Sequence, residues 1–401
     1  MKKLFYLPII IGLMATGFAG CNKNDNPPTI STESFFTIED AIFHKTGNLP
    51  SGSTPLINGL TINGTVITGG STIISFSSPE KIKTAYISVK GISGYFQYDF
   101  YDALSSKSAK SIYDYDLVLL ISQNLDEQDF VIEISCLSES GEYSIPVSTG
   151  NITVVEVGTG ILQVSLAWDQ FDDLDLHLLE PNGNKIYYGD PFALDPLVDE
   201  DELWFLFYCH LVTTYTSHDA SSLKYTNEDD RDILDDYLDD LWNMDMDESI
   251  FYWELNNFFA EWIVGGWLDM DSNPGCWIDS VNNENITYKN EPKAGVYYVA
   301  VDLYSKCDNS KPGAKYSVTV NYKGQTVTIS DKQVGQFTAN DEGSYDSPGE
   351  YHIIGAFTID ASGIKPAQVT GNPFANYYPA SRNAPSSVRL DKFKNSRKKS
   401  K

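Results

Sequence analysis

The sequence predicts an all-β fold with a helical insertion, organised as two β-sandwich domains in tandem. Short segments of alternating apolar and polar residues, separated by Gly, Asn, Ser and Pro, recur through most of the chain. A strongly acidic stretch with a helical period interrupts the second β-rich region. The length of 401 residues leaves room for two or three domains.

The N-terminus predicts export and a lipid anchor. Met1-Lys2-Lys3 is positively charged, and the apolar run over residues 4–18 is too short to span a bilayer stably. The run ends in Ala19-Gly20-Cys21, which resembles the lipobox of bacterial lipoproteins, with Phe18 where an aliphatic residue is usual. The resemblance implies a signal peptide over 1–20 and an acylated Cys21. The alternative is an ordinary signal peptide that leaves Cys21 unmodified.

The anchor would place the protein in the bacterial cell envelope, on the outer membrane, facing the periplasm or the cell surface. Residues 21–33 are polar and contain Pro27-Pro28, which predicts a flexible tether. The chain has 55 acidic and 28 basic residues and a formal net charge of −27. A field of that sign excludes nucleic acid as a partner and favours cations, basic proteins or neutral glycans.

Residues 34–157 predict an immunoglobulin-like β-sandwich. Apolar and polar residues alternate within 72–76, 83–89, 116–121 and 130–136. Strands of this length and spacing are typical of that fold. Cys136 shares a strand face with Ile132 and Ile134, which predicts a buried free thiol. Because the region gathers no catalytic residue types, we expect a spacer or interaction module.

Residues 161–362 predict a second sandwich, of jelly-roll or immunoglobulin-like type, with the acidic helical insertion at about 192–264. Helices are expected near 202–214 and 248–262, with a third between them whose N-cap is Thr226. The apolar residues of that third helix recur on one face: Ile233, Leu234, Tyr237, Leu238, Leu241 and Trp242. Residues 363–401 turn to Pro, Asn and Ser and then to Lys and Arg, which predicts a disordered basic tail.

Two acidic segments carry the candidate site. Strand alternation within 173–178 puts Leu174, Leu176 and Leu178 on the buried face and Asp173, Asp175 and His177 on the other. Alternation within 268–271 likewise separates Leu268 and Met270 from Asp269 and Asp271. The predicted metal ligands are Asp172, Asp173, Asp175, Asp269, Asp271 and Glu284.

The ion expected at this site is Ca²⁺. Two carboxylates about 4 Å apart repel by about 4 kcal/mol at an effective dielectric of 20, which a bound cation relieves. Oxygen ligands in an exported protein favour calcium, and we assign His177 a hydrogen-bonding role because nitrogen ligands favour transition metals. Two alternatives remain: the aspartates cap turns, or two of them form a catalytic pair.

The acidic segments and their neighbours resemble the uncharacterised YfaP-like domain of exported bacterial proteins. The matching runs are W-D-x-x-x-D-L-D-L-H at 168–177, P-x-G at 181–183, I-Y-Y-G at 186–189, G-G-x-L-D-x-D at 265–271, E-N-I at 284–286 and P-x-x-G-x-Y-x-V at 292–299. The resemblance covers about 160–330 without the insertion. It implies a β-sandwich and brings no established activity.

Four of the five cysteines remain after lipidation. We expect a Cys276–Cys307 disulfide, with a pairing of one of them to Cys209 as the alternative. Enzyme signatures such as H-E-x-x-H and G-x-S-x-G are missing from the sequence, so no catalytic residue is assigned.

These patterns together predict a non-enzymatic, membrane-anchored lipoprotein for binding, adhesion or envelope assembly, stabilised by calcium, with an unknown protein or glycan ligand. One alternative is a glycan-binding surface lipoprotein. The other is a carbohydrate-active hydrolase that uses two carboxylates.

Overall fold

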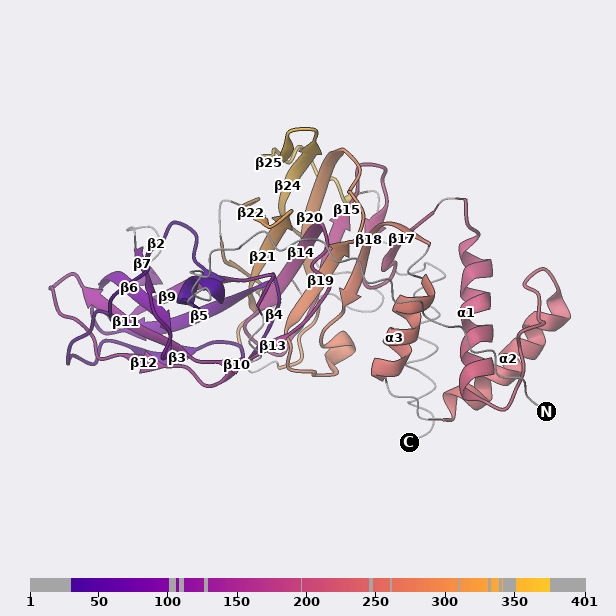
Figure 1. The fold of residues 1–401 in the computed structure, drawn as a ribbon, viewed down its shortest axis with the longest axis horizontal. Helices are drawn as coiled ribbons and strands as arrows, with labels where there is room; N and C mark the ends of the chain where they lie inside the picture. The colour runs from indigo at the N-terminus through magenta and orange to yellow at the C-terminus, as the bar shows by residue number, and fades with distance from the viewer. Residues whose placement is uncertain are drawn as a thin grey trace, which may run out of the picture. The chain divides into compact units, whose positions relative to one another are not determined.

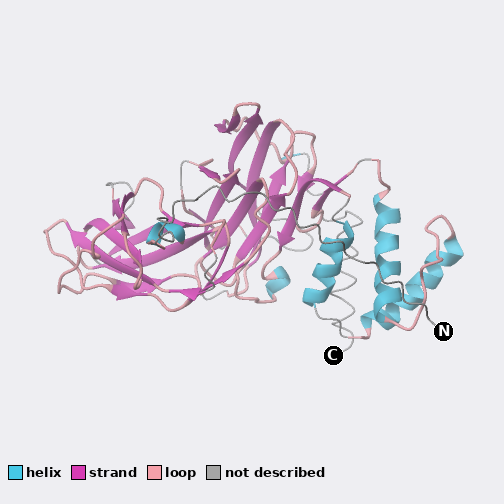
Figure 2. Ribbon diagram, in the orientation of Figure 1, coloured by secondary structure: helices cyan, strands magenta, loops and turns pink. Residues whose placement is uncertain are grey.

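β-strands form most of the regular structure, which confirms the all-β fold with a helical insertion (Figures 1 and 2). The computed structural model describes residues 30–100, 106–107, 112–125, 129–195, 197–244, 248–259, 262–308, 311–330, 333–338, 341 and 351–375. The predicted signal peptide, Cys21 and the tether as far as residue 29 lie outside these ranges. Within them, no helix combines the length and the apolar character needed to cross a membrane.

The first β-rich region contains three sheets around one apolar core. One sheet has the order β1 (Phe36–Thr37), β9 (Tyr113–Ile121), β5 (Ser71–Ser78) and β3 (Asn58–Thr61), with β8 (Ser106–Lys107) also paired to β9. The second has the order β12 (Val147–Ser148), β11 (Ile132–Ser138), β6 (Ile82–Val89), β7 (Tyr95–Asp99) and β2 (Ile42–His44). The third has the order β10 (Asp129–Phe130), β13 (Ile152–Val155) and β4 (Thr65–Ile67). Cys136 is buried and free, as predicted.

The second β-rich region contains two sheets. The larger has the order β17 (Phe192–Leu194), β18 (Ile263–Met270), β19 (Asn283–Tyr288), β14 (Leu162–Trp168), β21 (Lys315–Tyr322) and β22 (Gln325–Val327), with β23 (Gly335–Gln336) also paired to β21. The other has the order β16 (Lys185–Ile186), β15 (Asp173–Leu179), β20 (Gly295–Ser305), β24 (His352–Asp360) and β25 (Gly363–Ala367). Alternate residues of β14 and β15, such as Leu166 and Leu176, enter one shared core.

The predicted insertion is present between β17 and β18 as α1 (Glu200–Tyr215), α2 (Glu228–Trp242) and α3 (Glu248–Phe259). Its core is rich in aromatic side chains, and Phe259 stacks on Phe192 of β17 with ring centroids 5.0 Å apart. This contact joins the helices to the second sandwich. The expected N-cap at Thr226 is wrong by one residue, because the side chain of Asn227 accepts a hydrogen bond from the amide of Asp229.

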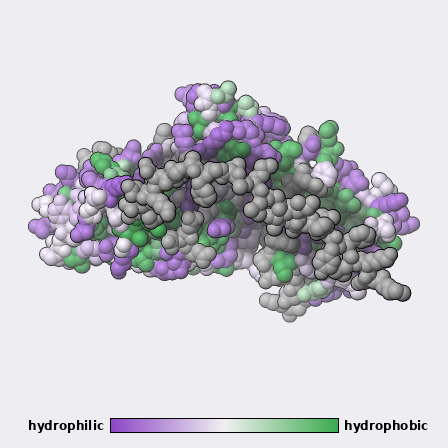
Figure 3. All heavy atoms as spheres, in the orientation of Figure 1, coloured by the Kyte–Doolittle hydropathy of each residue, from purple (hydrophilic) through white to green (hydrophobic). Residues whose placement is uncertain are grey.

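The surface reflects the acidic composition. Hydrophilic residues cover much of the described surface on the face that Figure 3 shows. The aspartates of α2 are exposed to solvent: Asp232, Asp235, Asp236, Asp239 and Asp240. Their mutual repulsion is therefore weakened by water.

The predicted tail begins too early at residue 363, because the chain continues as β25 and pairs with β24. Residues 363–375 belong to the fold, and residues 376–401 lie outside the described part. The turn into β25 uses Gly363 at φ 115°, and Asp360 accepts a hydrogen bond from the amide of Ser362. Beyond β25, Phe374 is fully buried and stacks on Tyr351 with ring centroids 5.7 Å apart.

Replacing Phe374 with Ala removes a buried ring and should lower the free energy of unfolding by about 3 kcal/mol. Urea unfolding measures the change. Phe171→Ala is the matched control, because Phe171 is 46% exposed and its loss should cost about 0.5 kcal/mol or less. Equal effects of the two substitutions would contradict a packed segment after β25.

Candidate metal centre

Glu284 lies between the two sheets of the second sandwich. On β19 it is directly opposite Leu166 of β14, and residues opposite each other share a face, so its side chain enters the core. Its Oε2 accepts a hydrogen bond from the amide of Leu176 in β15, at 2.5 Å. β16 pairs with β15 only at Leu178 and Leu179, so the Glu284 carboxylate takes the place of a neighbouring strand at Leu176.

Asp175 brings the second carboxylate to this place from β15. It is 2% exposed, and it lies opposite Asp302 of β20 in the antiparallel register. Asp175, Asp271 and Glu284 each offer one carboxylate oxygen within 4.8 Å of the other two. A second group with the same spacing consists of Asp175, His177 and Asp302.

The electrostatic cost of this cluster is visible in the pKa values of its buried members. Burial raises the pKa of Asp175 well above its usual value, and the charges of Asp302, Asp173, Glu284 and Asp271 raise it further. Burial also raises the pKa of Glu284 well above its usual value, with Asp271 as the largest charge contribution. The folded chain therefore binds protons at these carboxyls more tightly than the unfolded chain does, unless a cation neutralises them.

Two oxygens of the cluster lack hydrogen bonds. Asp175 Oδ2 and Glu284 Oε1 are buried and have no hydrogen-bond partner among the described residues. A buried polar atom left without a partner costs about 1–3 kcal/mol. A cation held between the two side chains would remove this cost and the repulsion together.

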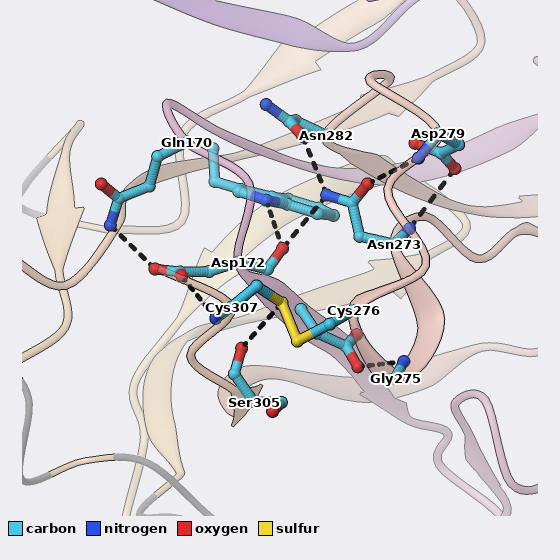
Figure 4. The surroundings of a disulfide bond; sticks show 11 residues. Gln170, Asp172, Asn273, Gly275, Cys276, Asp279, Asn282, Ser305 and Cys307 are labelled. Carbon is cyan, nitrogen blue, oxygen red and sulfur yellow. Dashed lines mark hydrogen bonds between the residues drawn. A yellow bond between two sulfur atoms is a disulfide. The ribbon is translucent and has the colours of Figure 1, made fainter. Parts of the chain in front are cut away.

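Asp173 connects the cluster to the loop after β18. Its Oδ2 accepts a hydrogen bond from the amide of Gly275 in η2 (Pro274–Cys276) at 2.5 Å. The same loop is fastened by a disulfide between Cys276 and Cys307, which is the pairing expected from the sequence (Figure 4). Asn273 adds a further link, because its side chain donates to the carbonyl of Asp172 at 3.1 Å.

Asp172 is placed outside the cluster. Its Oδ1 accepts a hydrogen bond from the amide of Cys307 at 3.1 Å, and its Oδ2 accepts one from the side chain of Gln170 at 2.8 Å (Figure 4). One oxygen of Asp172 therefore binds the disulfide loop, and the other binds the side chain of Gln170. This is the turn-capping role that the sequence left open, and among the described residues Asp172 belongs to neither group with metal-ligand spacing.

Asp269 is also placed elsewhere, and a bulge explains why. Leu268 is opposite Ile286 while Met270 is opposite Asn285, so β18 advances two residues where β19 advances one. The bulge breaks the alternation that would have put Asp269 and Asp271 on one face. Asp269 accepts hydrogen bonds from the amide of Gly158 at 2.6 Å and from the side chain of Asn285 at 2.7 Å.

Sequence reasoning missed Asp302 and misjudged the exposure of β15. Every residue of β15 is buried on both faces, so Asp175 and His177 do not line a solvent-facing surface. His177 has the expected hydrogen bond, with Nε2 3.0 Å from Oδ1 of Asp302. In the sequence, Asp302 is a single acid between Val301 and Leu303 in an apolar strand. Alternation puts its side chain on the face opposite to theirs, and this was the only sign of its role.

In comparisons with known proteins, no family model matches the chain and no curated protein matches it. The geometry of the site therefore carries the functional argument.

In a chelator, the free energy of unfolding should fall as the pH rises above the usual carboxyl pKa of about 4. Asp175 and Glu284 bind protons more tightly in the folded chain, so their contribution is present below the usual carboxyl pKa of about 4 and is lost as the pH rises through the raised values. Asp175→Asn should reduce this slope. Urea unfolding at several pH values measures it, and equal slopes in the two proteins would contradict the assignment.

Proposed function

We propose that this chain is an exported, lipid-anchored envelope protein whose second sandwich binds Ca²⁺ and acts as a non-enzymatic binding or adhesion module. One observation carries the proposal: Asp175 of β15, Glu284 of β19 and Asp271, directly after β18, converge with two buried oxygens that lack hydrogen-bond partners among the described residues. The YfaP-like motifs of the sequence include all three residues and support the same site.

The oxygens lie close enough together to share one ion. Calcium–oxygen distances are about 2.4 Å, so ligands on opposite sides of one ion lie about 4.8 Å apart. Three oxygens within 4.8 Å of one another can therefore surround a single ion. Asp173, whose charge acts on both Asp175 and Glu284, is a further candidate ligand.

A bound ion would clamp the sandwich. Asp175 belongs to β15 in one sheet, whereas Glu284 belongs to β19 in the other. One cation would bridge the two sheets, and through the hydrogen bond of Asp173 to Gly275 it would also steady the disulfide loop. Calcium would thus stabilise the loop that the module presents to its partner.

That loop offers a contact surface. Trp277 is 50% exposed and Ile278 is 43% exposed, directly after the disulfide-bonded Cys276. Exposed aromatic and aliphatic side chains on a loop fixed by a disulfide suit binding to a protein partner. Trp277 alone would also suit stacking on a glycan. The burial of Asp175 and Glu284 closes them to a sugar, which weighs against the hydrolase alternative.

Export and the anchor rest on the N-terminal sequence. The resemblance of residues 18–21 to a lipobox supports acylation of Cys21. The disulfide between Cys276 and Cys307 supports an oxidising compartment, since such bonds persist outside the cytoplasm.

Calcium should raise the melting temperature of the protein. At about 10 mM Ca²⁺ and a dissociation constant of about 10⁻⁴ to 10⁻³ M, mass action stabilises the fold by about 1.4–2.7 kcal/mol. Asp175→Asn and Glu284→Gln should abolish the rise. In chelator at neutral pH, Asp175→Asn should be more stable than the wild type, because the amide can be buried without taking up a proton.

Asp269→Asn is the matched control for these variants. Asp269 is an acid of β18 that forms hydrogen bonds away from the cluster, so the variant should keep the calcium-dependent rise. An unchanged melting temperature of the wild type on adding calcium, or an equal loss of response in Asp269→Asn, would refute the proposed site.

Cys21→Ala should abolish the incorporation of labelled palmitate in bacterial cells and release the protein from the membrane fraction, because the acylated residue is lost. Incorporation at the wild-type level would show that Cys21 is not the anchor.

A further inference from the structure

We propose that the chain binds a second divalent cation, of the borderline transition-metal class represented by Zn²⁺, through His177, Asp302 and Asp175. The site lies on the face of β15 and β20 that is opposite the core leucines. The proposal rests on the proposed function in one respect, because Asp175 would bridge this ion and the calcium ion.

The register of two strands brings the three ligands together. Asp175 and His177 are two residues apart on β15 and therefore share a face, and Asp302 is directly opposite Asp175. Nε2 of His177 is 3.0 Å from Oδ1 of Asp302. Two ligands at about 2.1 Å from a tetrahedral ion lie about 3.4 Å apart, so a small separation of the hydrogen-bonded pair would admit zinc, which would then replace that hydrogen bond.

The third ligand atom is available for the ion. Asp175 offers a carboxylate oxygen within 4.8 Å of the ligand atoms of both partners. A carboxylate that bridges two ions binds one through each oxygen, so Asp175 can serve both groups to which its spacing assigns it. A nitrogen together with two carboxylate oxygens is a donor set that suits zinc, whereas calcium prefers oxygen alone.

The imidazole ring is held in position. His177 is 1% exposed, and Tyr187 stacks on it with ring centroids 5.4 Å apart and an interplanar angle of 23°. Tyr351 meets the ring edge-on, at 4.6 Å and 84°. Packing that prevents rotation of a ligand lowers the entropic cost of binding a metal, which is how supporting residues act around known centres.

The test is the number and identity of the ions bound by the full chain. Metal-free protein is titrated with Zn²⁺ in excess Ca²⁺, and bound zinc is measured by elemental analysis after dialysis. We expect one zinc ion per chain in the wild type. His177→Gln and Asp302→Asn should each weaken zinc binding at least tenfold while the calcium-dependent rise in melting temperature remains.

His210→Gln is the matched control. His210 Nε2 is also 3.0 Å from a carboxylate, that of Glu254 on α3, but no third acid completes a group there among the described residues. The variant should keep full zinc binding. A loss of zinc equal to that of His177→Gln would overturn the assignment.

Co²⁺ in place of zinc tests the wild-type chain directly, whether or not the variants fold. Its visible absorption should report nitrogen ligation and should disappear when zinc is added. A wild-type chain that binds no zinc, or cobalt without nitrogen ligation, refutes this proposal. A calcium response without zinc binding leaves the proposed function standing, and zinc binding without a calcium response leaves only the second site.

Discussion

Buried carboxylates held close together determine much of the second sandwich. Leu166 and Leu176 draw β14 and β15 into one core, and the same packing carries Glu284 and Asp175 toward each other. Apolar burial favours the approach, while repulsion of about 4 kcal/mol for charges near 4 Å opposes it at an effective dielectric of 20. Bound protons or cations must therefore reduce the repulsion between the carboxylates. Because the acids come from both sheets, whichever species occupies the site also affects how firmly the sheets are joined.

The fold followed from the sequence where the periodic signal was long. Alternation in stretches such as β5, β6 and β11 predicted strands, and the acidic helical period predicted α1 to α3. The error at β25 has a physical origin. Gly363–Ala367 contains Pro366, and a proline cannot donate a hydrogen bond to a neighbouring strand, so the sequence of this segment predicts coil. The strand forms because β25 lies at the edge of its sheet, where a proline is tolerated. The burial of Phe374 depends on tertiary contacts that no local pattern encodes.

The site was predictable as far as strict alternation held. The period of two placed Asp175 and His177 on one face, and Asp271 and Glu284 were also brought into the cluster as expected. The bulge in β18 reversed the direction of Asp269, and a one-residue irregularity leaves little trace in composition. Asp302 stood alone in an apolar strand, so only its partner strand revealed its role. Asp172 lay beyond the strand, where alternation gives no guidance.

The place where the helices enter the sandwich has a consequence for assembly. The chain leaves along β17 and returns along β18, and these strands pair directly, with Phe192 opposite Trp267 and Leu194 opposite Ile263. Closing so long a loop costs conformational entropy, although the cost grows only slowly with length. If the helices pack around their aromatic core first, they bring β17 and β18 together, and the two strands can then pair as a hairpin. The helices would then act as a local folding nucleus for one edge of the sheet, independent of whatever they contact later.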